Sequence, residues 1–230
     1  MFLVGICMCI SCGYFISTAV LTSFGFSSTV STQTQKIYAI SMQKSEVRNE
    51  LSDALLQLQM QNGAGFVFEK DNQFYLLASI YENINDAELV KTNLKSSGVN
   101  AEILEFEIKN EGLSGNFSSE EKNILNEAMK ANFEAFKGLY DVAISLDTSV
   151  FDKANAKLEC NKIYSSLITK QTNLNSFFKE DNTEINTLKN KLDYAIKCLY
   201  CLTCEEYENS AQTFSSLIKL TYCKILLNVH

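Results

Sequence analysis

The chain has 230 residues, of which 46% are hydrophobic, and its formal net charge is −7. This length allows a membrane segment, one small domain and a second domain of about a hundred residues. The acidic balance provides no basic field to hold phosphate backbones, so the composition argues against nucleic acid as a partner.

The amino-terminal segment, residues 1–26, is apolar and carries no charged residue. A helix of about 25 residues is long enough to cross the hydrocarbon core of a bilayer. We therefore expect a transmembrane anchor or signal segment, with a buried helix of a soluble domain as the alternative. Cys9-Ile10-Ser11-Cys12 is faintly similar to a lipoprotein cleavage box. No Lys or Arg precedes Lys36, so the positive-inside tendency would place the carboxyl side of the segment in the cytoplasm.

An uncharged polar linker is predicted at residues 27–35, followed by a small domain at residues 36–109. Within that domain the order strand, helix, strand occurs twice. The first copy comprises residues 36–42, 45–61 and 66–68, and the second comprises residues 74–81, 85–97 and 99–108. Two such units pack as a four-stranded antiparallel sheet with both helices on one face, which is the ferredoxin-like βαββαβ arrangement.

The second copy resembles a known family, the SPOR (sporulation-related repeat) domain. The similar segments are Phe74-Tyr75-Leu76-Leu77-Ala78-Ser79-Ile80-Tyr81, Asp86-Ala87-Glu88 and Leu94-Lys95-Ser96-Ser97-Gly98. The first copy matches more loosely, through Tyr38-Ala39-Ile40-Ser41-Met42. The resemblance implies binding to peptidoglycan glycan strands in the cell envelope, linked to cell division or sporulation. It also implies a single-pass anchor in the cell membrane, with the bulk of the chain extracytoplasmic.

Strand alternation places one row of residues on the sheet face that points away from the two helices. We expect this open face to bind glycan, and its candidate residues are Ala39, Ser41, Tyr75, Leu77, Ser79 and Tyr81. Tyrosine rings can contact the apolar faces of sugar rings while their hydroxyls reach sugar oxygens. The alternative is that aromatic residues are simply favoured in strands and that the following domain covers this face.

A second linker at residues 110–117 precedes a predicted helical domain at residues 118–230. Ser118-Ser119-Glu120-Glu121 is a good helix start. Polar breaks near residues 148–152, 178–183 and 205–210 divide the region into four helices, which predicts an antiparallel bundle. The bundle is either a packed core without a ligand or a docking face for a protein partner.

The sequence contains few residues in arrangements typical of metal binding or catalysis. Cys198, Cys201 and Cys204 could hold a metal if a fourth ligand came near, but metal-binding cysteines usually lie on turns. We interpret them as small buried hydrophobes. The only histidine is His230, so a Ser-His-Asp arrangement is not plausible. We therefore predict no catalytic residues, no metal, no cofactor and no enzymatic activity.

Two functions follow as hypotheses. The first is a membrane-anchored SPOR-like protein that binds glycan strands. The second is a non-enzymatic membrane scaffold, whose helical domain recruits a protein partner and whose SPOR-like domain no longer binds glycan. A cytoplasmic ferredoxin-like domain that binds a small molecule is a third class, which rests only on the charge asymmetry.

Overall fold

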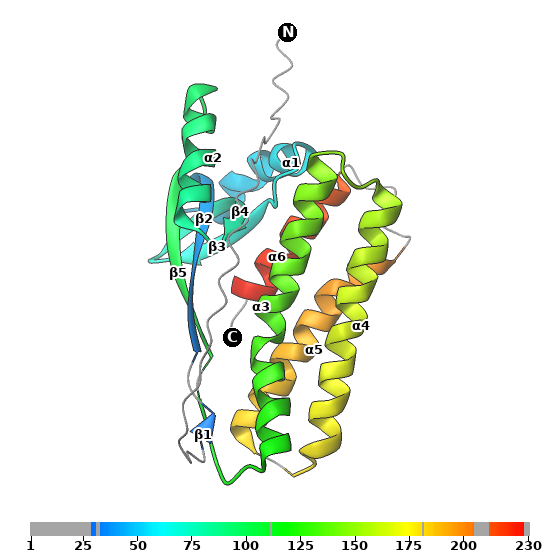
Figure 1. Ribbon diagram of the computed structural model, residues 1–230. Coiled ribbons are helices and arrows are strands. Elements are labelled where there is room, and N and C mark those ends of the chain that lie inside the picture. The colour runs from blue at the N-terminus through cyan, green and yellow to red at the C-terminus, as the bar shows by residue number, and fades with distance from the viewer. Residues whose placement is uncertain (1–28, 31–32, 111, 181, 205–211, 228–230) are drawn as a thin grey trace.

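The computed structural model describes residues 29–30, 33–110, 112–180, 182–204 and 212–227. A four-stranded antiparallel sheet in the order β3-β4-β2-β5 is flanked on one face by α1 and α2 and on the other by a helical bundle (Figure 1). The strands are β2 (Gln33–Ser45), β3 (Phe66–Lys70), β4 (Gln73–Tyr81) and β5 (Glu102–Asn110). A short 3-10 helix, η1 (Arg48–Leu51), precedes α1 (Ser52–Met60), and α2 is Ile84–Ser96.

The βαββαβ order is therefore the one that the two sequence copies indicate. One part of the predicted fold class needs correction, which is the transmembrane helix. No helix among the described residues is long and apolar enough to cross a membrane. Residues 1–26, to which that helix was assigned, lie outside the described residues. The described chain is an α+β structure made of a ferredoxin-like sheet unit and helices.

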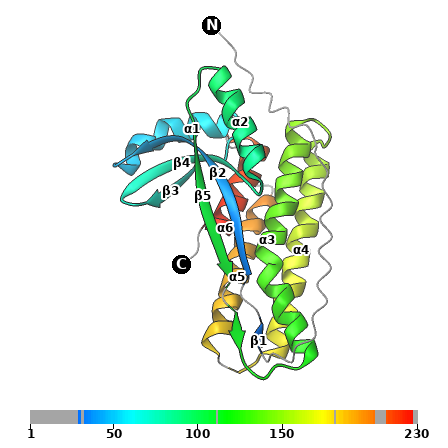
Figure 2. The same ribbon diagram turned by 60° about the vertical axis from the view of Figure 1, so that its left-hand side comes forward.

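The two predicted linkers contain paired strands. β1 (Thr29–Val30) and β6 (Leu113–Ser114) pair with each other in a separate two-stranded sheet. β2 also begins at Gln33, inside the first predicted linker, and pairs with β5 as far as Asn110. The β2–β5 ribbon therefore continues beyond the sheet and runs alongside the bundle (Figure 2).

Local sequence explains where the helices of the sheet unit begin and end. The side chain of Asn83 accepts a hydrogen bond from the backbone N–H of Asn85 at 2.9 Å and so caps α2. After α1 the chain turns sharply, and a Cβ at Gly63 would lie 2.4 Å from Leu58 Cδ1. Gly65 has a φ of +59°, a conformation that glycine enters without strain.

Four helices form the bundle: α3 (Ser119–Asp147), α4 (Lys153–Phe177), α5 (Thr183–Thr203) and α6 (Phe214–Leu227). Helices α3, α4 and α5 pack side by side along their lengths. Helix α6 lies between them and the sheet (Figure 1). It buries eleven of its fourteen residues, because it has neighbours on all sides. A helix in that position is covered all round rather than along a single stripe.

A capping box starts α3. The Ser118 hydroxyl accepts from the backbone N–H of Glu121, and the Glu121 carboxylate accepts from the backbone N–H of Ser118. We expect Ser118→Ala to lower the free energy of unfolding by about 1 kcal/mol, because the backbone N–H of Glu121 loses the hydroxyl that accepts its hydrogen bond. Urea denaturation of both proteins measures this change, and Ser119→Ala, one position inside the helix, is the matched control.

The hydrogen bonds to Ser118 lower the pKa of the Glu121 carboxyl. Because the folded-state pKa lies below the ordinary value, the stabilisation is present above the ordinary glutamate pKa and is lost as the pH falls through the lowered value. The stability difference between the wild type and Glu121→Gln should therefore shrink in acid. A difference that stays constant down to acidic pH would contradict this assignment.

Candidate functional site

The sheet face predicted to bind glycan is not open. Five of its six candidate residues are buried: Ala39, Ser41, Leu77, Ser79 and Tyr81. Only Tyr75 is partly exposed. On the side of the sheet that faces the bundle, the cause is α6, which packs on β3 and β4 where the sequence predicted solvent. At the centre of this contact the Ser79 and Tyr222 hydroxyls are hydrogen-bonded at 2.6 Å.

Tyr81 lies on the opposite side of the sheet from the other candidates. The β2–β4 register shifts between the pairs Ile40–Ser79 and Ser41–Leu77. A shift of one residue exchanges the faces of the residues beyond it. As a result Ile80 packs in the core shared with the bundle, while Tyr81 packs in the core beneath α1 and α2.

The Tyr81 ring contacts Tyr140 of α3 edge to face, with 5.9 Å between ring centroids. Burial raises the pKa of the Tyr81 hydroxyl far above its ordinary value. Burial has the same effect on the pKa of Tyr222. These hydroxyls therefore stay protonated in the folded protein and act as structural hydrogen-bonding groups rather than as acids or bases.

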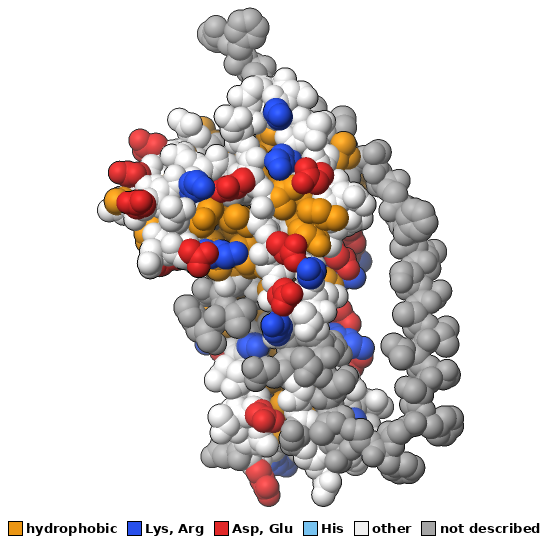
Figure 3. Space-filling view, turned by 90° about the vertical axis from the view of Figure 1, so that its left-hand side faces the viewer, with side chains coloured by type: hydrophobic (Ala, Val, Ile, Leu, Met, Phe, Trp, Pro, Cys, Tyr) orange, Lys and Arg blue, Asp and Glu red, His pale blue; other side chains and the backbone are white. Residues whose placement is uncertain are grey.

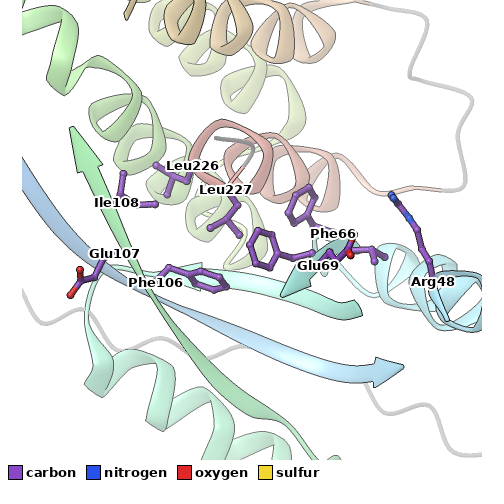
Figure 4. A pocket seen from close by; sticks show the side chains of 10 residues that line it. Arg48, Phe66, Glu69, Phe106, Glu107, Ile108, Leu226 and Leu227 are labelled. Atoms are coloured by element: carbon purple, nitrogen blue, oxygen red, sulfur yellow. The ribbon is translucent and has the colours of Figure 1, made fainter. Parts of the chain in front are cut away.

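One part of the concave sheet face remains accessible, and it forms a groove between the two edge strands. The groove has a volume of about 580 Å³, and the end of α6 forms one of its walls (Figure 4). Its apolar lining comes from β3, β5 and α6: Phe66, Val67, Phe68, Phe106, Ile108, Leu226 and Leu227. We call this the edge groove. The sheet curls so strongly that the Phe68 and Phe106 rings meet edge to face, with centroids 5.0 Å apart.

Charged side chains of both signs line the rim of the edge groove. Arg48, Glu69 and Glu107 contribute to the lining, and Lys70 Nζ lies 5.5 Å from the centroid of the Phe106 ring. Glu107 is paired with Lys109 at 3.3 Å. Arg48 makes no ion pair with any residue that the structure describes.

The lining of the edge groove is mainly apolar. Among the described residues it includes no Ser, Cys or His. Aromatic and aliphatic side chains dominate, with a few polar groups at the margin, which is typical of a ligand-binding surface. The space-filling view of the side that lies to the left in Figure 1 shows hydrophobic side chains gathered in orange areas, among red and blue charged side chains (Figure 3).

The cysteines beyond the amino-terminal segment are all free thiols. Cys160 and Cys223 are buried, whereas Cys198, Cys201 and Cys204 are partly exposed rather than buried as the sequence indicated. Across the described residues, no group of three or more His, Cys, Asp or Glu side chains could hold a metal ion.

Thiol labelling should follow this difference in burial. Desolvation raises the pKa of the Cys160 thiol to about 12, so almost no thiolate exists near neutral pH. We expect a brief maleimide pulse on the native protein to modify Cys201 and Cys204 and to leave Cys160 and Cys223 unmodified. Peptide mass spectrometry reads the sites, and denatured protein is the control in which all of them react. Native labelling of Cys160 at the rate of Cys201 would contradict this packing.

Sequence reasoning missed the edge groove, although part of its signal was available. Phe66 and Phe68 alternate along one strand, as do Leu104, Phe106 and Ile108 along another. These rows predict apolar positions on one sheet face. The sheet curvature that brings β3 and β5 close together has no comparable pattern in the sequence.

Sequence reasoning also missed a buried ion pair within the bundle, whose lysine is hydrogen-bonded to the sheet unit as well. Lys219 of α6 pairs with Asp147 of α3 at 2.5 Å, and its ammonium also donates to the Asn62 carbonyl at 2.7 Å. The Lys219 side chain is only 4% exposed. One lysine thus connects α6, the end of α3 and the loop after α1.

Comparisons of this chain with protein-family models, with curated proteins and with solved structures found no match. The resemblance to SPOR domains therefore rests on the strand and helix segments quoted above.

Proposed function

We propose that this protein is a non-enzymatic interaction protein that binds a protein partner through the edge groove. The sheet unit serves as the platform on which the helical bundle is built, instead of presenting an open glycan-binding face. The observation that carries this proposal is the accessible apolar lining of the edge groove. The buried contact between Ser79 and Tyr222 lies at the centre of the face expected to bind glycan and closes that face.

Burial at that contact leaves no room for a sugar chain. A glycan strand needs an accessible surface across several sugar rings, and binding on this face would require α6 to leave the sheet. That step would expose Ile218, Tyr222 and Ile225, which are at most 4% exposed. Each such side chain contributes about 1.5–3 kcal/mol through its burial. The groove is already open, so a ligand can bind there without this cost.

The composition of the edge groove favours a partner with apolar side chains. Three phenylalanines and four aliphatic residues line it. Aromatic residues in a concave, partly desolvated pocket are the usual anchors of protein–protein binding. The mixed charges at the rim can orient a partner without requiring a strongly charged one.

Peptidoglycan glycan remains a second candidate ligand for the same groove. The specific observation in its favour is the pairing of three phenylalanine rings with a rim that carries both cationic and anionic groups. Sugar rings present apolar faces to aromatic side chains, and their hydroxyls both donate and accept hydrogen bonds.

Site-specific photocrosslinking separates these ligands. A benzophenone amino acid replaces Phe106 in the groove, and in a control protein it replaces Leu158, which is 54% exposed on α4. After irradiation of cells that make the protein, we expect a discrete protein adduct from position 106 that is missing from position 158. The adduct should also disappear when Phe66→Ala is added, because the opposite groove wall is then lost.

Pelleting of the full chain with purified peptidoglycan, before and after an amidase removes stem peptides, completes the test. The proposal expects no pelleting in either state. Pelleting that is abolished by Phe66→Ala, without a protein adduct at position 106, would replace it with the glycan candidate. Failure to obtain either result would exclude the edge groove as the ligand site.

A further inference from the structure

Within the part of the chain that the structure describes, no strand pairs with one edge of β5, and this edge lies beside the edge groove. The strand has nine residues and lies at the end of the sheet, where it pairs with β2 alone. Among the described residues, none makes a backbone hydrogen bond to the outer edge of β5. A row of unpaired N–H and C=O groups of this length is a template for another extended chain.

The side chains of β5 differ between its two faces. Leu104, Phe106 and Ile108 are half-buried on the face that joins the edge groove. Glu105, Glu107 and Lys109 alternate with them and are exposed. A strand added to this edge would therefore direct every second side chain toward the groove and the others toward the glutamates.

We propose that the edge groove takes an extended peptide segment of the protein partner, which adds to the sheet as a further strand on the free edge of β5. This inference rests on the proposed function and names the chemistry of the partner. The segment carries apolar residues at every second position, which contact Phe106, Ile108 and the groove. Lys or Arg residues stand between them, opposite Glu105 and Glu107.

The charges along β5 support basic residues at those positions. The strand carries three glutamates and one lysine, so its own side chains are net acidic. Lys36 already pairs with Glu105 at 2.5 Å, but it approaches from β2, on the other side of β5. The Glu105 and Glu107 side chains keep 49% and 45% of their exposure. Each carboxylate can accept from a second cation.

The contrasting explanation is that these charges only protect an edge strand against association. Exposed charged residues on edge strands commonly have that role. A purely protective edge would form no backbone hydrogen bonds with either a basic or an acidic peptide. Strand addition depends on two features, the unpaired backbone groups of β5 and the charges of its side chains. Each feature can be tested separately, the first by blocking the backbone of the peptide and the second by reversing charges.

The probe is a short synthetic peptide in which Lys alternates with Val and Phe, added to the full chain. We expect it to slow amide hydrogen exchange within residues 102–110, measured by mass spectrometry, and to leave α4 unchanged. The same peptide with N-methyl groups along one edge should give no protection, because it cannot form the ladder of hydrogen bonds. A matched peptide with Glu in place of Lys should bind about tenfold more weakly or worse.

Two protein variants test the groove side and the charged side. Phe106→Ala should weaken binding by about tenfold, because the peptide loses its main apolar contact. Glu105→Lys with Glu107→Lys should weaken it by a similar factor through like-charge contact. Glu159→Lys, at a partly exposed position on α4 outside the lining of the groove, is the control and should leave binding unchanged. Circular dichroism of each variant verifies that the fold is retained.

The outcomes distinguish the inference from the function on which it rests. If the N-methylated peptide protects β5 equally well, or if the acidic peptide binds as tightly as the basic one, strand addition is overturned. A protein adduct at position 106 would in that case still support the groove as a partner site. If the adduct is also missing, the proposed function fails as well.

Discussion

Replacing Lys219 by alanine should lower the free energy of unfolding by about 3–5 kcal/mol. The ammonium is enclosed by α6, the end of α3 and the loop after α1, and its partner Asp147 is 12% exposed. Without the lysine, the Asp147 carboxylate is left in a poorly solvated site with no cation beside it. One buried Asp147 oxygen has no hydrogen-bond partner even with Lys219 present, so the site offers no evident donor that could stabilise the carboxylate in place of the lysine. Guanidinium denaturation at neutral pH measures the change.

A matched exposed pair provides the control for Lys219. Lys137 and Glu82 also connect the bundle with the sheet unit, at 2.8 Å, but both side chains are about half exposed. We expect Lys137→Ala to cost less than about 1 kcal/mol, since water replaces the lost partner. Replacing both buried partners, Lys219→Met with Asp147→Leu, should recover most of the stability lost in Lys219→Ala. Equal losses at Lys219 and Lys137 would show that the Lys219 pair is not desolvated.

Truncation of Tyr222 should produce the second large effect, about 3–5 kcal/mol for Tyr222→Ala. The residue is fully buried, and its ring meets that of Phe136 edge to face with 5.5 Å between centroids. Alanine would leave a cavity between α3, α6 and the sheet. Tyr222→Phe keeps the ring and should cost only about 1–2 kcal/mol, which isolates the hydrogen bond to Ser79.

The way in which Tyr222→Ala unfolds is also informative. Because Tyr222 connects the sheet unit to the bundle, we expect amides of both β4 and α3 to lose hydrogen-exchange protection together. Protection lost in α3 alone would mean that the sheet unit is stable without the bundle. The sheet unit and the bundle would then unfold independently, despite the core that they share.

Much of the fold could be predicted because its signals are local. The repeated strand-helix-strand order, the Ser118 capping box and the polar breaks between helices are set by neighbouring residues. The boundaries of α3 to α6 lie close to the predicted breaks for the same reason. Tertiary packing has no local signal of that kind, and the errors lie there.

The candidate site shows why the remainder could not be predicted. The sequence placed Leu77 and Ser79 on the correct sheet face, but alternation cannot say whether another element covers that face. Tyr81 was assigned to the wrong face because a register shift leaves no mark in the order of residues. Lys219 was overlooked because a lysine in an apolar helix normally reaches solvent, and its partner lies 72 positions away.

The position of α6 has a consequence for how the protein is made. During synthesis the strands and the three longer helices leave the ribosome before α6 does, yet α6 ends up between them. Until it arrives, β4 and α3 lack the helix that packs on both of them, and Phe136 lacks the Tyr222 ring. A nascent chain paused before residue 214 would therefore expose apolar surface that is buried in the complete fold. Chaperone binding during translation should be strongest in that interval and should end when α6 docks.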